Sequence, residues 1–145
     1  MTSITLSDNG DFDDLLTIDS LTATPTAPQP GSDLQITIKG TTSADITAGA
    51  YIDVTVKLGL IKLLRKQFDL FEELRASSTT VGQATLNMTV AQQKDSVIPA
   101  GDFTLTYAIT LAKEIPKARF NVTAEFWNTD DADIATIGAQ LELRS

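Results

Sequence analysis

The sequence FTLTYAITL, residues 103–111, alternates large apolar side chains with smaller ones, mostly threonine. Side chains two positions apart lie on the same face of a β-strand, so this alternation gives a strand two different faces. The apolar face consists of Phe103, Leu105, Tyr107, Ile109 and Leu111. The stretch therefore predicts a strand that buries one face and leaves the other to solvent.

The same alternation continues along the chain in both directions. It recurs at residues 34–39, 51–58, 84–90, 120–126 and 137–144, and less regularly at 15–24. These segments make about seven strands, many rich in Thr and Val and separated by Pro and Gly. Strands with one apolar face each favour two antiparallel sheets packed face to face. We therefore expect an all-β sandwich.

One segment, Gly59 to Ala76, breaks the period of two. Its apolar residues fit a helical spacing as well as a strand that simply continues. We expect the preceding strand to run on to about Leu64 and a short helix to follow near Leu70 to Ala76.

Length and composition describe one folded domain. The chain has 145 residues, 42% of them hydrophobic and 21% charged, with a formal net charge of −8. A core of this size needs no disulfide or metal for stability. We expect residues 1–12 to form an acidic N-terminal extension and residues 13–145 to form a single domain. The negative charge disfavours nucleic acid as a partner, because phosphate binding needs clustered Lys and Arg.

The sequence contains neither histidine nor cysteine. The commonest general base, the commonest metal ligand and every thiol nucleophile are therefore missing. Acidic residues gather near the N-terminus and at 130–133, but they lack the spacing of a calcium loop. We expect a non-catalytic protein with no metal and no cofactor.

No apolar run approaches the ~20 residues of a membrane span, and the N-terminus lacks the basic and apolar regions of a signal peptide. The lack of a signal peptide, together with the lack of cysteine, favours a cytoplasmic location.

Three quoted stretches carry a family resemblance. They are ITAGAYIDVTVKLGLIKLLRKQFDLFEELR at 46–75, DDLLTIDSLTATPTAPQPGSDLQITIKGT at 13–41 and IPAGDFTLTYAITLAKEIPKARFNVTAEFWNTDDADI at 98–134. Together they resemble the ML-domain lipid-recognition family, which includes fungal phosphatidylglycerol/phosphatidylinositol transfer proteins and Niemann-Pick type C sterol carriers. The resemblance implies an immunoglobulin-like sandwich with an apolar cavity between its sheets. It also implies that the protein encloses one phospholipid or sterol and transfers it between membranes.

The sequence departs from that family in having no cysteine. Family members are usually secreted or vacuolar and carry disulfides, with a cysteine where this chain has Phe71 and another near 135–137. A protein of a reducing compartment would lack them. An engineered cysteine-free sequence would look the same, so both origins stay open.

The resemblance implies that large inward-facing residues line the lipid cavity. Pattern alone favours ordinary core for each of them, since an apolar face must be buried against something. The predicted lipid-binding residues are Val54, Val56, Leu58, Leu64, Phe68, Phe71, Phe103, Leu105, Tyr107, Phe120, Val122 and Phe126.

Basic residues are concentrated in residues 57–66 and in the EIPKAR turn at 114–119. We predict a basic rim that meets anionic lipid headgroups and makes transient contact with membrane surfaces. The alternative is a solvated charged face. The predicted rim residues are Lys62, Arg65, Lys66 and Lys117.

A second function remains open from the sequence. The same sandwich with a filled core would be an interaction module that binds a protein or glycan by its surface. For the lipid carrier we expect a monomer.

Overall fold

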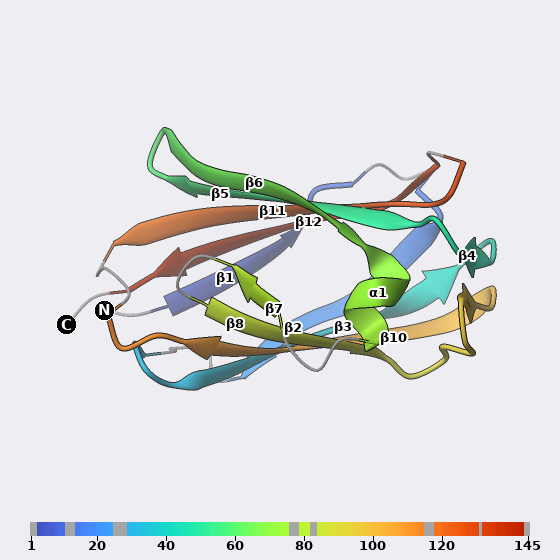
Figure 1. Ribbon diagram of the computed structural model, residues 1–145, viewed down its shortest axis with the longest axis horizontal. Helices are drawn as coiled ribbons and strands as arrows, with labels where there is room; N and C mark the ends of the chain where they lie inside the picture. Colours follow the sequence, from blue (N-terminus) through green and yellow to red (C-terminus); the bar gives the residue numbers. More distant parts are fainter. Residues whose placement is uncertain are drawn as a thin grey trace.

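The computed structural model describes residues 3–10, 14–24, 29–75, 79–81, 84–114, 118–130 and 132–143. Two five-stranded antiparallel sheets pack face to face, and a short two-stranded sheet lies at one end (Figure 1). This arrangement is the all-β, immunoglobulin-like sandwich expected above.

The first sheet has the strand order β1-β12-β11-β5-β6. Its strands are β1 (Ser3–Asp8), β12 (Asp133–Glu142), β11 (Arg119–Trp127), β5 (Tyr51–Leu58) and β6 (Ile61–Asp69). The second sheet has the order β2-β3-β10-β8-β7. Its strands are β2 (Leu16–Thr24), β3 (Asp33–Thr42), β10 (Gly101–Leu111), β8 (Ala84–Val90) and β7 (Thr79–Val81). The two-stranded sheet pairs β4 (Ile46–Thr47) with β9 (Val97–Ile98).

The strands predicted from alternation are confirmed as β2, β3, β5, β8, β10, β11 and β12. In β10 the face that carries Phe103, Leu105 and Leu111 is buried, because β10 pairs on both sides and packs against the other sheet. Strand β1 was not predicted. It pairs with β12 from Ser3 to Asp8, within the segment expected to be an N-terminal extension.

The prediction of a continuous strand as far as Leu64 is wrong. The chain reverses at Gly59 and Leu60, and β6 returns antiparallel to β5 with Leu58 opposite Ile61. Gly59 has a φ of 61°. A glycine with positive φ at the first central position suits a two-residue hairpin, whose twist matches that of the flanking strands.

The predicted short helix is confirmed as α1 (Leu70–Arg75). Asp69 begins it, because its Oδ1 accepts hydrogen bonds from the backbone N–H groups of Phe71 and Glu72, each at 3.1 Å. Leu70 and Phe71 are buried in the core. The helix is thus fixed at its first turn by a cap and by two apolar anchors.

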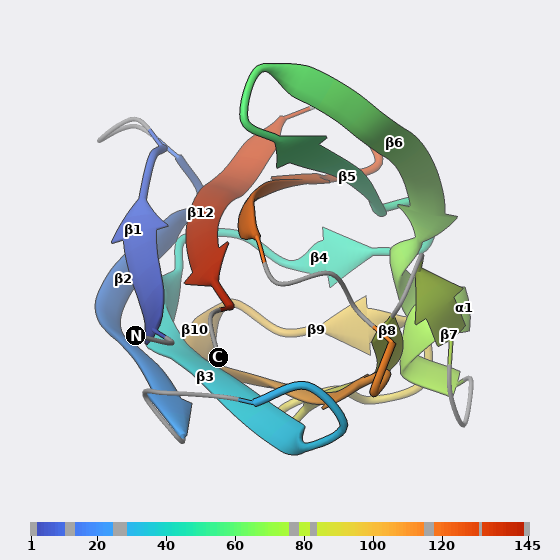
Figure 2. The same ribbon diagram turned by 90° about the vertical axis from the view of Figure 1, so that its left-hand side faces the viewer.

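The core consists of two clusters of buried side chains. The larger one joins both sheets, and the smaller one lies near the end of β10 and the start of β11, the same end of the sandwich as the two termini (Figure 1). The smaller cluster consists of Leu111, Phe120, Leu141 and Leu143. Seen from that end, β1 contacts β2 on one side, while on the other side α1 contacts both β6 and β8 (Figure 2).

Candidate functional site

The residues predicted to bind lipid divide into two groups of different burial. The buried group is Val54, Phe71, Phe103, Leu105, Phe120 and Phe126. The half-buried group is Val56, Leu58, Leu64, Phe68, Tyr107 and Val122. All of them except Leu64 belong to one of the two core clusters or pack against one, so the fold brings eleven of the twelve into the interior.

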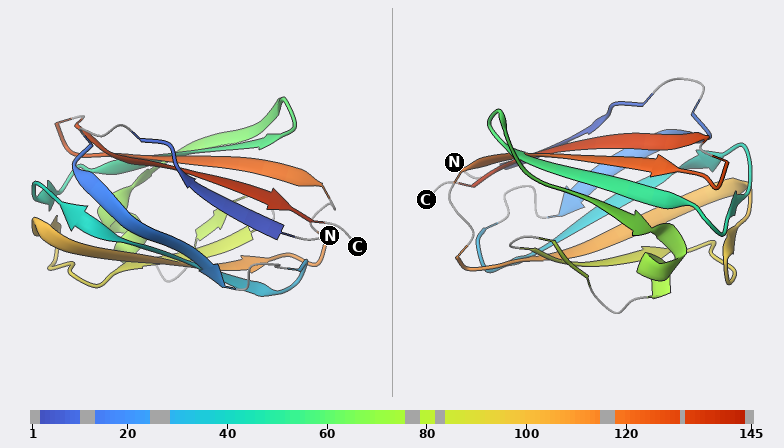
Figure 3. Two further views of the ribbon diagram at one scale, coloured as in Figure 1. Left: turned by 180° about the vertical axis from the view of Figure 1, so that it is seen from behind. Right: turned by 45° about the horizontal axis from the view of Figure 1, so that its top comes forward.

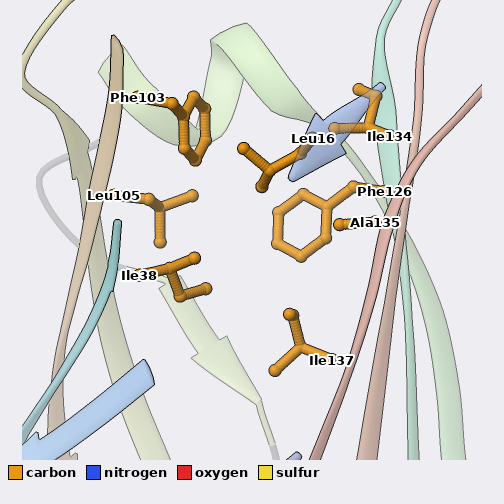
Figure 4. A pocket seen from close by; sticks show the side chains of 8 residues that line it. All are labelled: Leu16, Ile38, Phe103, Leu105, Phe126, Ile134, Ala135 and Ile137. Atoms are coloured by element: carbon orange, nitrogen blue, oxygen red, sulfur yellow. The ribbon is translucent and has the colours of Figure 1, made fainter. Parts of the chain in front are cut away.

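A small apolar cavity lies within the buried group (Figure 4). Its volume is about 10 Å³, which is roughly the minimum for one water molecule. Phe103, Leu105 and Phe126 are the predicted residues that line it, together with Leu16, Ile38, Ile134, Ala135 and Ile137. In this conformation the cavity has no room for an acyl chain.

The half-buried group occupies a different part of the interior. Val56 pairs with Leu64 on one side and with Val122 on the other, so these three side chains form a row across the first sheet. Tyr107 faces the interior from the second sheet, beside Met88 of β8. Each member of the row keeps part of its apolar surface accessible to solvent.

The structure adds three half-buried residues to this region that were not predicted as site residues. They are Leu86, Ile109 and Ala124. Ile109 pairs with Leu86, and Ala124 pairs with Val54. Their signal was present in the sequence, since each lies on the apolar face of a strand predicted from alternation. We call the row and these partners, Val56, Leu64, Leu86, Tyr107, Ile109, Val122 and Ala124, the half-buried belt.

Tyr107 carries the one ionisable group of the half-buried belt. Burial, and to a smaller degree the negative charge of Glu73 on α1, raises the pKa of Tyr107 well above its ordinary value. The phenol therefore stays neutral in any physiological buffer. A neutral phenol in an apolar region can donate one hydrogen bond to a polar atom of a bound molecule.

The predicted basic rim is divided between the two faces of β6. Arg65 lies opposite Thr55 and makes an ion pair with Asp53, with the Nη2–Oδ2 distance at 3.7 Å. Lys66 shares the phase of Phe68, and its Nζ lies 5.2 Å from the centre of that ring. Lys62 lies opposite Lys57 near the hairpin turn. Lys117 lies outside the described residues.

Two further findings concern only the part of the chain that the structure describes. No group of three or more acidic side chains there is arranged to hold a metal ion. No helix there has the length and apolar character to cross a membrane.

A family model for the ML domain matches residues 9–143 of this chain. Among curated proteins, a phosphatidylglycerol/phosphatidylinositol transfer protein of Cryptococcus neoformans is 36% identical over 124 residues, covering 86% of this chain and 62% of that protein. The protein of the same name from Aspergillus oryzae is 34% identical over 126 residues, covering 87% of this chain and 63% of the relative. This chain thus spans less than two thirds of the length of these relatives.

Solved structures give the same fold at lower sequence identity. A Niemann-Pick type C2 protein from the Japanese carpenter ant superposes with a TM-score of 0.56 at 17% identity, covering 97% of this chain and 99% of that one. The C-terminal domain of wzt superposes with a TM-score of 0.55 at 10% identity, covering 98% of this chain and 78% of that one. At these identities the likeness concerns the sandwich alone.

Proposed function

This chain belongs to the ML domain family, and from that premise we propose that it binds one lipid between its sheets and carries it between membranes. The named relatives support this proposal, because they are called phosphatidylglycerol/phosphatidylinositol transfer proteins. The cargo is then a phospholipid or a sterol. Such a carrier binds without chemistry, which suits an interior with apolar walls.

The observation that carries the proposal is the half-buried belt. Apolar side chains that face the interior of a sandwich are normally covered completely by the opposite sheet. Here Val56 and Ile109, which pack against both core clusters, are only half-buried. Val122, which packs against the larger cluster, is half-buried as well. A lipid tail that contacted them would remove this surface from water, with about 25 cal/mol gained per Å².

The water-sized cavity beside Phe126 cannot hold a lipid tail unless its walls move. A drug-sized ligand fills a pocket of about 300–1,000 Å³, far more than the cavity beside Phe126 provides. We propose that the sheets separate when lipid enters. The edge strand β6 is suited to that movement, because it pairs only with β5 along its length in the described part of the sheet.

The proposal is tested by native mass spectrometry of the purified protein, followed by solvent extraction of whatever accompanies it. We expect a stoichiometric adduct that extracts as a phospholipid or a sterol. A bare polypeptide mass, combined with no lipid uptake from mixed vesicles, would contradict the proposal. That result would favour the interaction module, which the small size of the described cavity already supports.

The predicted basic rim gives a second test. We expect the Lys62→Gln, Arg65→Gln, Lys66→Gln triple variant to transfer lipid about tenfold more slowly from anionic vesicles, and at an unchanged rate from neutral ones. The loss should be smaller than three unpaired cations would cause. Arg65 already pairs with Asp53, and Lys66 already lies over the ring of Phe68. Added salt reduces the difference. Equal slowing from both kinds of vesicle would contradict a headgroup rim.

A further inference from the structure

The turn between β5 and β6 exposes large apolar side chains. Leu60 is 101% exposed, Ile61 66% and Leu63 50%. In the part of the chain that the structure describes, Val97 is the other large apolar residue of this kind, at 38%. The turn rises from the edge of the first sheet, near the end of the sandwich that holds both termini (Figure 3). We call Leu60, Ile61 and Leu63 the apolar tip.

Single exposed leucines are common on protein surfaces and require no explanation. The apolar tip differs because its residues lie within four consecutive positions of one hairpin. Two-residue turns ordinarily carry Gly, Asn, Asp or Ser, whose backbone preferences and polarity suit an exposed reversal. Gly59 fulfils the backbone requirement, so the leucine beside it serves no need of the turn. Burial of the apolar tip against another apolar surface would lower its free energy.

The charges around the apolar tip indicate what covers it. Residues 57–66, KLGLIKLLRK, contain four basic side chains and no carboxylate, although the whole chain has a net charge of −8. Lys57 and Lys62 lie directly opposite each other across the hairpin, and like charges in that position repel. Neither has an ion pair among the described residues. An array of anionic groups would relieve this repulsion.

A second copy of the chain is a poor match for this surface. Symmetric dimers bring the same patch of both subunits together. Two apolar tips in contact would therefore place Lys57 and Lys62 of each copy near the same cations of the other. An anionic bilayer has no such conflict, because acyl chains lie directly beneath a layer of phosphates.

We infer that the apolar tip inserts into the interface of an anionic phospholipid bilayer, with Lys57 and Lys62 against the phosphates. This inference rests on the proposed lipid-carrier function and names the element by which the carrier docks. Insertion brings the edge strand β6 to the membrane surface. Leu64 and Phe68, whose half-buried side chains face the interior, follow the tip along the same strand. A lipid leaving the bilayer along β6 would thus reach the half-buried belt directly.

The absence of cysteine permits a direct measurement of insertion. Leu60→Cys and, as the control, Val97→Cys each accept one environment-sensitive fluorophore. We expect the probe at position 60 to shift to shorter wavelength with phosphatidylcholine vesicles that contain phosphatidylglycerol. We also expect nitroxide groups on the acyl chains to quench it, and the probe at position 97 to respond to neither. A position-60 probe that stays in water with these vesicles would overturn the inference.

An affinity measurement complements the probe. We expect Leu60→Ser to bind the same anionic vesicles about tenfold more weakly, because it removes one leucine side chain from the bilayer. Val97→Ser is the matched control and should bind as the unaltered chain does. Leu60 makes no core contact, so the thermal unfolding of Leu60→Ser should be unchanged.

The failure of this inference differs from the failure of the proposed function. Uptake of a monomeric short-chain phosphatidylglycerol, measured without vesicles, reports on the interior alone. If the unaltered chain takes up this lipid and Leu60→Ser binds vesicles with full affinity, the inference that the apolar tip inserts is wrong. The proposed carrier function would then still stand. If the unaltered chain does not take up this lipid, the proposed carrier function itself is wrong. A blue shift that depends on protein concentration and needs no vesicle would assign the tip to a second copy instead.

Discussion

Val122→Trp should lose most of the lipid binding of this protein while the sandwich stays folded. Val122 lies on β11, which pairs on both sides within the first sheet, and its half-buried side chain faces the interior beside Val56. An indole ring there occupies space that a lipid tail would use. If it excludes about three methylene groups at about 0.8 kcal/mol each, the affinity falls roughly 50-fold. Titration with a fluorescent phospholipid measures the change.

The matched control is Thr123→Trp, one position along the same strand. Thr123 lies opposite Thr55 on the outward face of the sheet, so its indole ring should leave the interior unchanged. Crowding in an interior typically costs 1–3 kcal/mol, so thermal unfolding of both variants must accompany the titration. Unaltered lipid binding by a folded Val122→Trp would exclude the half-buried belt as the lipid site.

The strand pattern was predictable because each central strand buries one face only. Leu105 is 1% exposed while its neighbour Thr104 is half-buried, and this contrast follows directly from alternation in the sequence. The helix at Leu70 was predictable from helical spacing, and the structure adds Asp69 as its cap. Both elements depend on local sequence and on one apolar face, and both features can be recognised in a single sequence.

The β5–β6 hairpin was not predictable in the same way. Its turn has one glycine and no polar residue, and apolar side chains continue through it, so the pattern resembles a single long strand. Tertiary contacts do not decide the reversal, because Leu60 and Ile61 are exposed. The apolar residues that continue through the turn explain why alternation did not predict it. The same residues make the apolar tip a candidate for membrane contact.

The sequence also could not predict which inward-facing residues are buried and which are half-buried. Phe120 and Val122 share one face of β11, yet Phe120 is buried and Val122 is not. Phe120 packs in a cluster with Leu111 of the second sheet, whereas the sheets leave Val122 partly uncovered. Burial at each position depends on how closely the two sheets approach there. Alternation identifies the inward face and carries no information about that distance.

Phe71 anchors α1 in the core. Its side chain is 1% exposed in the larger core cluster, on a helix that contacts β5, β6 and β8. The helix has six residues, too few to be stable alone. A buried phenylalanine therefore helps to join the two sheets through packing.

Phe71→Ala should consequently cause the largest loss of stability among the variants considered. Removal of a fully buried phenylalanine typically costs 3–5 kcal/mol, and a domain has about 5–15 kcal/mol in total. The unfolding temperature should fall on the order of 10 °C, measured by calorimetry or circular dichroism. Phe68→Ala, three positions earlier and half-buried, is the control and should cost less than half as much. Equal losses for the two variants would mean that α1 does not anchor the sheets through Phe71.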